Sequence, residues 1–361
     1  IWTAMAGVGA PIGLLLGGWA VESYDWQMVF WINIPIIALA LLLGLFLVPN
    51  SMDGQRRPLD PLGALLSVGG LGSILYAIIE APAHGWLSNE TLGIAALGVI
   101  LMVAFVRWEQ RVEHPLLPMG LFRDRGFTLG LIAIMFAFFV MFSFMFTQML
   151  HFQLVRDKTA LEAAIRFLPL PLGLGPVAAN SDRIVERFGS KNVVTTGLVL
   201  VSLGMALFTT VDIGTAYPVI GATFLLLGIG MGLTMAPSTT LVMEAVPDDK
   251  AGVGSATNDA SREVGGALGI AIGGSVLNEY YQRSMTIPEG LEHLGSVPLE
   301  SFPAAMRIGG EMLAGGNMAG LELIEAARAS FVEGMVASAM VGGAIALTTA
   351  VVVKLYMPGK D

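Results

Sequence analysis

The sequence predicts an all-α polytopic membrane protein with about ten transmembrane helices. Of its 361 residues, 55% are hydrophobic and only 13% are charged, whereas an ordinary globular domain is about 25% charged. Apolar runs bounded by charge, Pro or Gly recur along the whole chain, and many approach the roughly 20 residues that cross a bilayer. Lys and Arg gather in alternate loops, as expected for a chain that crosses a membrane repeatedly.

The apolar runs define ten candidate spans. They lie at about 1–21, 27–48, 60–80, 90–106, 127–149, 160–180, 192–211, 215–243, 253–278 and 329–354. The second and fifth runs contain no charge, whereas the sixth contains Glu162 and Arg166. The ninth begins with Asp259, Arg262 and Glu263.

The distribution of basic residues orients the spans. One set of loops, with the C-terminal end, holds 13 of the 19 Lys and Arg residues, the opposite set holds 5, and Arg166 lies in a span. Since cytoplasmic loops carry the excess of basic residues, both ends of the chain are predicted to face the cytoplasm. The outer loop at 280–328 is acidic and rich in Gly and Pro, and we expect a solvated connector there.

Composition also excludes several functions. The chain has no Cys, which removes disulfides, thiolate metal sites and thiol nucleophiles. The four His residues are scattered and the net charge is −9, so neither a metal site nor nucleic-acid binding is expected. No clustered His, Asp or Ser indicates an enzyme, and no cofactor is predicted. The first run lacks a charged leader, so it is not a signal peptide, and we interpret Ile1 as a cut end.

Glycines form a stripe on the first span. Gly9, Gly13 and Gly17 are spaced four apart, with Gly18 beside them and Pro11 between. Small residues at this spacing let two membrane helices approach closely, and Pro bends a helix. Taken alone, the stripe is also explained by ordinary packing between membrane helices. The same spacing recurs at residues 265, 269 and 273.

The surrounding residues resemble a known family. Residues 13–18 (GLLLGG), Trp26 and residues 30–35 (FWINIP) resemble the fifth and sixth helices of the fourteen-helix drug:proton antiporters of the major facilitator superfamily. In that family the antiporter motif seals the contact between the two halves. Here it would comprise Gly9, Pro11, Gly13, Gly17 and Gly18, with Leu14 where the family usually has Pro.

The resemblance extends along the chain. Residues 114–127 resemble the family's link into its second half, residues 164–178 its tenth helix and residues 251–274 its thirteenth. A cytoplasmic loop motif follows the tenth helix and comprises Asp182, Arg183, Glu186, Arg187, Gly189 and Lys191. Three positions differ from the family, at 182, 186 and 190. The resemblance implies a charge network that closes the cytoplasmic side; the basic residues alone would equally serve as an orientation signal.

The resemblance also implies a domain organisation. Residues 1–48 would be the last two helices of the N-terminal half, residues 49–126 an inserted helix pair with a cytoplasmic link, and residues 127–361 a complete six-helix C-terminal half. The first four helices of the family would then be missing.

The function implied is proton-coupled efflux of lipophilic or cationic drugs across the bacterial inner membrane by alternating access. The partners would be the lipid bilayer, a small-molecule drug and protons. Ionisable residues in spans are candidate functional groups, here Glu162, Arg166, Asp259 and Arg262. The first two also fit an intrahelical ion pair, and the last two a helix start. Residues 127–149, rich in Met and Phe, fit either adaptable drug binding or a lipid-facing helix. Alternatives are an exporter of an endogenous metabolite or self-made antibiotic and, more distantly, a non-transporting scaffold.

Overall fold

The computed structural model describes residues 2–47, 60–247 and 250–359, and these residues form helices and connecting loops without a strand. The first part contains α1 (Trp2–Ser23), α2 (Met28–Trp31), α3 (Asn33–Leu47), α4 (Pro61–His84), α5 (Asn89–Glu109) and η1 (Met119–Arg123). The next part contains α6 (Arg125–Leu150), η2 (His151–Val155), α7 (Ala160–Arg166), α8 (Pro169–Ala179), α9 (Ser181–Phe188), α10 (Ser190–Phe208) and α11 (Tyr217–Glu244). The last part contains α12 (Ala251–Ser284), η4 (Glu292–Leu294), α13 (Val297–Glu300), α14 (Phe302–Ala314) and α15 (Ala319–Tyr356). The predicted all-α class is confirmed.

Eight helical segments are long and apolar enough to cross a bilayer. They include the α6–η2 segment (Arg125–Val155) and the α7–α8 segment (Ala160–Ala179), each of which spans two labelled elements. The two remaining expected spans, 1–21 and 253–278, are helical as well, as α1 and α12. Charged residues in the first half of α12 lower its hydropathy relative to the other long helices. A polytopic membrane protein is therefore confirmed.

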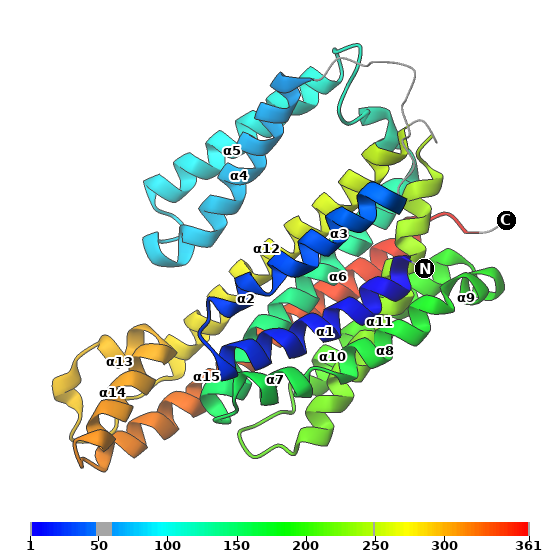
Figure 1. Cartoon of the computed structure of the whole chain (residues 1–361). Helices are drawn as coiled ribbons and strands as arrows, with labels where there is room; N and C mark the ends of the chain where they lie inside the picture. The colour runs from blue at the N-terminus through cyan, green and yellow to red at the C-terminus, as the bar shows by residue number, and fades with distance from the viewer. Residues whose placement is uncertain (1, 48–59, 248–249, 360–361) are drawn as a thin grey trace.

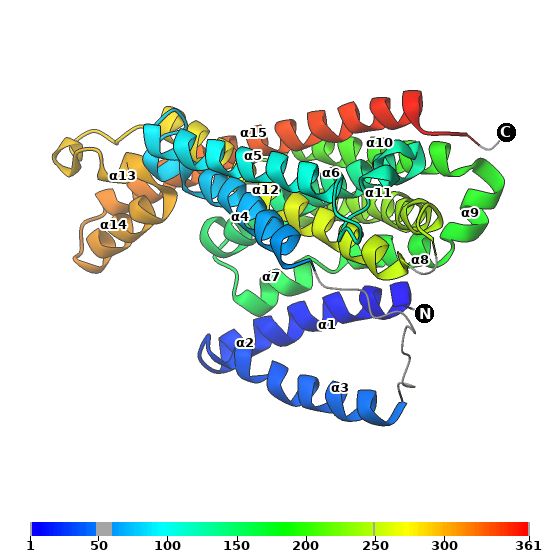
Figure 2. The ribbon, with the colours of Figure 1, turned by 90° about the horizontal axis from the view of Figure 1, so that it is seen from above.

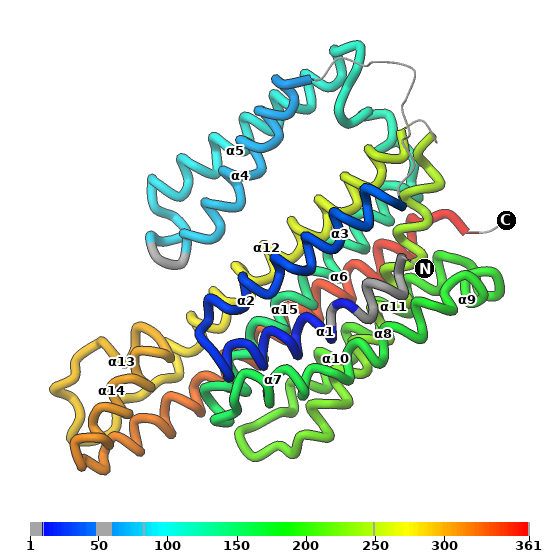
Figure 3. The backbone as a smooth tube through the Cα atoms, in the orientation of Figure 1, coloured from blue at the N-terminus to red at the C-terminus, as the bar shows by residue number. Residues whose placement is uncertain are grey.

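The C-terminal part is a bundle in which α6 packs on α11, α12 and α15, while α10 joins α11 to α15 (Figure 1). The α1–α3 segment lies along one side of this bundle and contacts it through α1, which packs on α7 and α8 (Figure 2). The α4–α5 hairpin lies on another side, where α4 contacts α12. Figure 1 shows the start of α1 at the same end of the bundle as α9 and the end of α15, and the backbone tube follows α9 and α15 to that end (Figure 3). This arrangement agrees with an even number of crossings.

Aromatic rings fill the core of the bundle. Phe144, Phe152, Phe167 and Phe224 are almost fully buried. The Phe224 ring lies edge-to-face with those of Phe144 and Phe167, at 5.1 and 4.8 Å between centroids, and stacks on that of Phe152 at 6.2 Å. Edge-to-face pairs at such distances stabilise beyond simple area burial. Because Phe144 belongs to α6, the Phe-rich segment 127–149 is not a plain lipid-facing helix: one of its faces forms the bundle core.

The segment between α12 and α15, on the predicted outer side, is packed, so the expected solvated connector is wrong. Tyr281 is fully buried, and its hydroxyl donates a hydrogen bond to the Pro298 carbonyl at 2.8 Å. The Phe302 ring lies 4.4 Å from that of Phe331 on α15. Apolar side chains spaced among the acidic ones, such as Leu291, account for this packing. Burial raises the pKa of the Tyr281 hydroxyl above its ordinary value.

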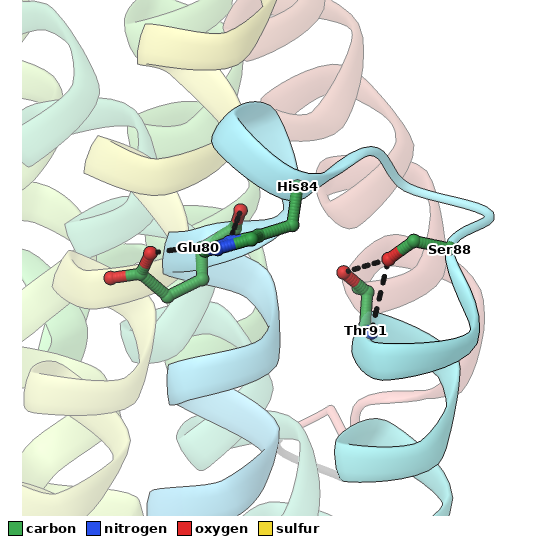
Figure 4. A network of polar contacts seen from close by, with 4 residues as sticks. All are labelled: Glu80, His84, Ser88 and Thr91. Carbon is green, nitrogen blue, oxygen red and sulfur yellow. Dashed lines mark hydrogen bonds and ion pairs between the residues drawn. The ribbon is translucent and has the colours of Figure 1, made fainter.

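Polar contacts lie on both sides of the turn between α4 and α5, one set at the end of α4 and one at the start of α5 (Figure 4). The Ser88 hydroxyl caps α5 by accepting from the Thr91 amide at 3.2 Å, as is typical of a Ser N-cap. His84 lies 3.5 Å from the Glu80 carboxylate one turn before it. Both side chains are partly exposed, as suits polar groups at a turn near the membrane surface.

Candidate functional site

The predicted antiporter motif lies on α1, where it packs against the C-terminal bundle. Gly18 is buried, and a Cβ at this position would lie 3.0 Å from the Ala160 carbonyl oxygen and 3.0 Å from the Leu161 Cα. Among the described residues no atom lies within 4 Å of a Cβ built at Gly9, Gly13 or Gly17. Successive residues of a helix are rotated by about 100°, so the stripe is turned away from the contact. The expected close approach is made by Gly18 instead, while Pro11 lies inside the helix as expected.

The second glycine stripe makes the close approach that its spacing predicts. A Cβ at Gly265 would collide with the Met135 carbonyl oxygen, and one at Gly269 with that of Phe139. A Cβ at Gly273 would meet the Ser143 hydroxyl. The backbones of α12 and α6 are therefore in contact over two turns, as small-residue stripes allow in lipid.

A polar cluster connects α12 to α11 towards the predicted cytoplasmic end. Arg262 lies 3.6 Å from Asp259 and donates to the Thr239 hydroxyl at 3.3 Å. Its guanidinium also lies over the Phe138 ring of α6, 5.5 Å from the centroid. Asn258 continues the cluster through Thr239 at 3.4 Å. Asp259 and Arg262 are thus brought together, and Arg262 connects three helices rather than merely beginning one.

The cytoplasmic loop motif folds as a short helix, α9, between α8 and α10. Asp182, Arg183, Glu186 and Arg187 are exposed, and the described residues form no ion pair among them. The Arg187 guanidinium lies over the Phe188 ring at 5.3 Å. Gly189 ends α9 with φ at 77°, a conformation that glycine adopts without a steric penalty. The motif thus has the geometry of a tight helix–helix corner, while Lys191 begins the next helix without an ion pair in the described part of the chain.

The expected ion pair between Glu162 and Arg166 is not formed. Glu162 pairs with Lys158 at 3.7 Å, and Arg166 donates to the Glu162 main-chain carbonyl at 2.9 Å. The Arg166 guanidinium lies 5.9 Å from the centroid of the Tyr217 ring, and the Tyr217 hydroxyl donates to the Arg166 carbonyl. Glu162 had basic residues four positions away on both sides, and the cation–aromatic contact with α11 holds Arg166 away from it.

The end of α6 on the predicted outer side contains a row of buried polar side chains that the residue pattern did not predict. Gln148 and His151 are fully buried, and His151 Nδ1 lies 3.3 Å from Gln148 Oε1. Arg156 Nε donates to His151 Nε2 at 3.3 Å, and Arg156 Nη2 donates to the Thr215 carbonyl at 2.6 Å. The sequence feature that could have pointed to these polar contacts is a His and an Arg five positions apart in a predominantly apolar segment.

Charged residues around Arg156 extend this group of polar contacts. Burial lowers the pKa of the Arg156 guanidinium, and Asp212 partly offsets that effect. A hydrogen bond from the Thr215 hydroxyl holds the pKa of the Asp212 carboxyl below its usual value. Next to Arg156, the Asp157 carboxylate accepts two hydrogen bonds from Arg328 of α15. Polar contacts therefore connect the outer ends of α6, α11 and α15.

The base of the α4–α5 hairpin contains a second buried polar group that was missed. Asp60 and Glu109 are buried. Asp60 caps α4 by accepting from the Gly63 amide at 2.8 Å and also accepts from the Trp108 indole at 2.9 Å. Glu109 accepts from the Leu117 amide at 2.8 Å. These contacts connect both helices to the link that follows them.

Other binding chemistry is limited in the described part of the chain. No group of three or more His, Asp or Glu side chains there is arranged to hold a metal ion. A crevice beside Ser143 and Ser338, whose hydroxyls lie 3.3 Å apart, is too narrow for a water molecule. The described part of the bundle is thus closed at this point between α6 and α15.

The sequence matches the family model described as Major Facilitator Superfamily over residues 1–270. The chain belongs to the major facilitator superfamily. It is 30% identical over 319 residues to the multidrug resistance protein Stp of Mycobacterium tuberculosis, covering 86% of the chain and 59% of Stp. It is 30% identical to the multidrug efflux pump LfrA of Mycolicibacterium smegmatis, covering 98% of the chain and 69% of LfrA. It is 28% identical to the tetracenomycin C resistance and export protein of Streptomyces glaucescens, covering 98% and 66%.

This major facilitator chain is therefore a multi-pass protein of the bacterial inner membrane, related to drug efflux transporters rather than to enzymes. It spans 59% of Stp and about two thirds of the other two relatives.

Proposed function

We propose that the protein carrying this chain exports lipophilic or cationic drugs from the bacterial cytoplasm in exchange for protons, by alternating access. The observation that carries the proposal is the match to LfrA along 98% of the chain, at 30% identity. Transporters of this kind move one half against the other around a site near the bilayer midplane.

Polar clusters at the two ends of the bundle support the proposal. Alternating access requires contacts that form at one end while those at the other end break. The Arg262–Asp259–Thr239 cluster occupies one end, and the Arg156–Thr215 contact the other. We infer that the first cluster acts in closing the cytoplasmic side and the second in closing the outer side.

The predicted domains and motifs have roles in the same proposal. Residues 1–48 would contribute two helices of the N-terminal half, residues 49–126 the inserted pair with its link, and residues 127–361 the C-terminal half. Gly18 would hold α1 against α7 where the halves meet. The open glycine face of α1 would accept the backbone of another helix in another conformation. The α9 motif would act as a corner at the cytoplasmic surface.

A second candidate is an exporter of a self-made antibiotic or an endogenous metabolite. It is favoured by similarity to the tetracenomycin C resistance and export protein of Streptomyces glaucescens. The two candidates share the mechanism and differ in substrate, so a panel of lipophilic cations and aromatic polyketides separates them.

The test is efflux from proteoliposomes that hold the full-length protein, under an imposed pH gradient. We expect substrate movement that a protonophore abolishes. Arg262→Gln should lose this movement, because the guanidinium contacts with Asp259 of α12 and with the Phe138 ring of α6 are removed. Arg283→Gln is the matched control: Arg283 lies on the same helix, exposed and paired with Glu279 at 2.7 Å. An efflux rate that is the same with and without the pH gradient would refute proton coupling.

A further inference from the structure

The contacts of His151 fix its protonation state. Arg156 Nε has only a hydrogen to offer, so the His151 Nε2 atom that it contacts at 3.3 Å carries a lone pair. Gln148 Oε1 accepts, so the ring proton resides on Nδ1, 3.3 Å away. His151 is therefore a neutral imidazole whose two nitrogens are both engaged.

A second proton on this ring is incompatible with the arrangement. It would place two N–H donors and two positive charges face to face at Nε2. Among the described residues, Arg156 is the charged side chain that contacts His151, so no carboxylate offsets this repulsion. Charges from other elements act on Arg156 instead: Asp212 from the α10–α11 turn attracts it, and Arg166 from α7 repels it. On α15, Arg328 is already occupied by Asp157.

The arrangement ties two helices together at the outer end. Arg156 follows the last turn of the α6–η2 span, and its Nη2 donates to the Thr215 carbonyl just before α11. Its Nε is positioned by His151. The segment from His151 to Val155 is a π-helical turn, a form that is rare and frequent at functional sites. Loss of the contact at Nε2 therefore removes one of the two anchors of the Arg156 side chain.

We propose that His151 is a proton-binding residue of this transporter, and that a proton taken up at Nε2 releases Arg156 and with it the tie between α6 and α11. The inference rests on the proposed proton-coupled efflux. The proton comes from the outer solution, adds to the Nε2 lone pair to give an imidazolium, and leaves when Arg156 returns. No other bond is formed or broken. Uptake of the proton thus favours an open outer side.

The first experiment compares two transport modes of the full-length protein in proteoliposomes. His151→Gln keeps an oxygen that can accept from Arg156 but does not titrate. We expect loss of efflux driven by the pH gradient, while exchange of labelled for unlabelled drug at equal pH is retained. His84→Gln is the control, since His84 is exposed and pairs with Glu80; it should keep both modes.

The outcomes separate the two proposals. If drug efflux by the wild-type protein is unchanged by a protonophore, the proposed function is overturned and, with it, this inference. Wild-type protein that responds, with an equally responsive His151→Gln variant, overturns the inference alone. The same loss in His84→Gln also overturns it, because the effect would then not belong to the buried ring.

A second variant covers the case in which His151→Gln loses both modes. Arg156→Gln keeps the titrating ring and removes both the charge that faces it and the contact with Thr215, so its efflux is compared across pH relative to its own maximum. The pH dependence of efflux should then shift upwards by about one pH unit, a size typical of removing one nearby like charge. An unchanged pH profile in Arg156→Gln overturns the inference.

Discussion

Replacement of Gly269 by Ala tests whether backbone contact between α12 and α6 holds the C-terminal bundle together. A Cβ at this position would collide with the Phe139 carbonyl oxygen, and the Phe139 Cα would be 3.0 Å away. Both atoms belong to the main chain, so no side-chain rotation relieves the clash. One of the two helices must move away from the other.

The expected cost follows from two opposing contributions. Overpacking of a tight core costs about 1–3 kcal/mol, whereas Ala favours the helix over Gly by about 1 kcal/mol. Gly274→Ala is the matched control on the same helix, because a Cβ there would lie 3.5 Å from Phe146 Cε1, an ordinary contact. The control keeps the helix gain without the clash, so the two variants should differ in free energy of unfolding by about 1–3 kcal/mol.

The assay is unfolding of the purified full-length protein in detergent, by heat and by denaturant, for wild type and both variants. Gly269→Ala should unfold first and Gly274→Ala no earlier than wild type. Equal stability of the two variants would refute the close-contact reasoning for the stripe.

Two further predictions concern the hairpin base and the topology. Asp60→Ala removes the cap of α4 and leaves the Trp108 indole unpaired, so it should destabilise the protein by about 2 kcal/mol, measured by unfolding in detergent. A loss no larger than that of Ser67→Ala, at a partly exposed residue of the same helix, would contradict it. Asn192→Cys should react with an impermeant maleimide only from the cytoplasm and Ser296→Cys only from outside, against a background without Cys; reversed labelling would disprove the orientation.

The spans were predictable because lipid demands long apolar runs, and composition records them directly. The sequence does not show in the same way which helix packs against a glycine stripe. Gly265 and Gly9 stand in the same four-residue spacing, yet only the former meets a backbone in the described residues. The stripe shows that close approach is possible, and the rotation of the helix decides which side is used.

Local charge spacing was equally ambiguous. Glu162 lies four residues from Lys158 and four from Arg166, and the choice depends on Tyr217, which is distant in sequence. His151 was not predicted as a site because its contact with Arg156, and that of Arg156 with Thr215, require the π-helical turn. Neither the turn nor the distant carbonyl leaves a pattern in the residue spacing.

The packed outer segment has a mechanical consequence. The 38 residues of α15 make a rod about 57 Å long, nearly twice the roughly 30 Å of hydrocarbon. α14 packs on α15, and the Tyr281 hydroxyl of α12 donates a hydrogen bond to the Pro298 carbonyl. The ends of α12 and α15 and the segment between them therefore form one stiff extension. A tilt of α15 within the membrane then displaces the far end of this extension more than it displaces the membrane-embedded part. A dye pair with one member on α14 would register rocking of the half more sensitively than one placed between the spans.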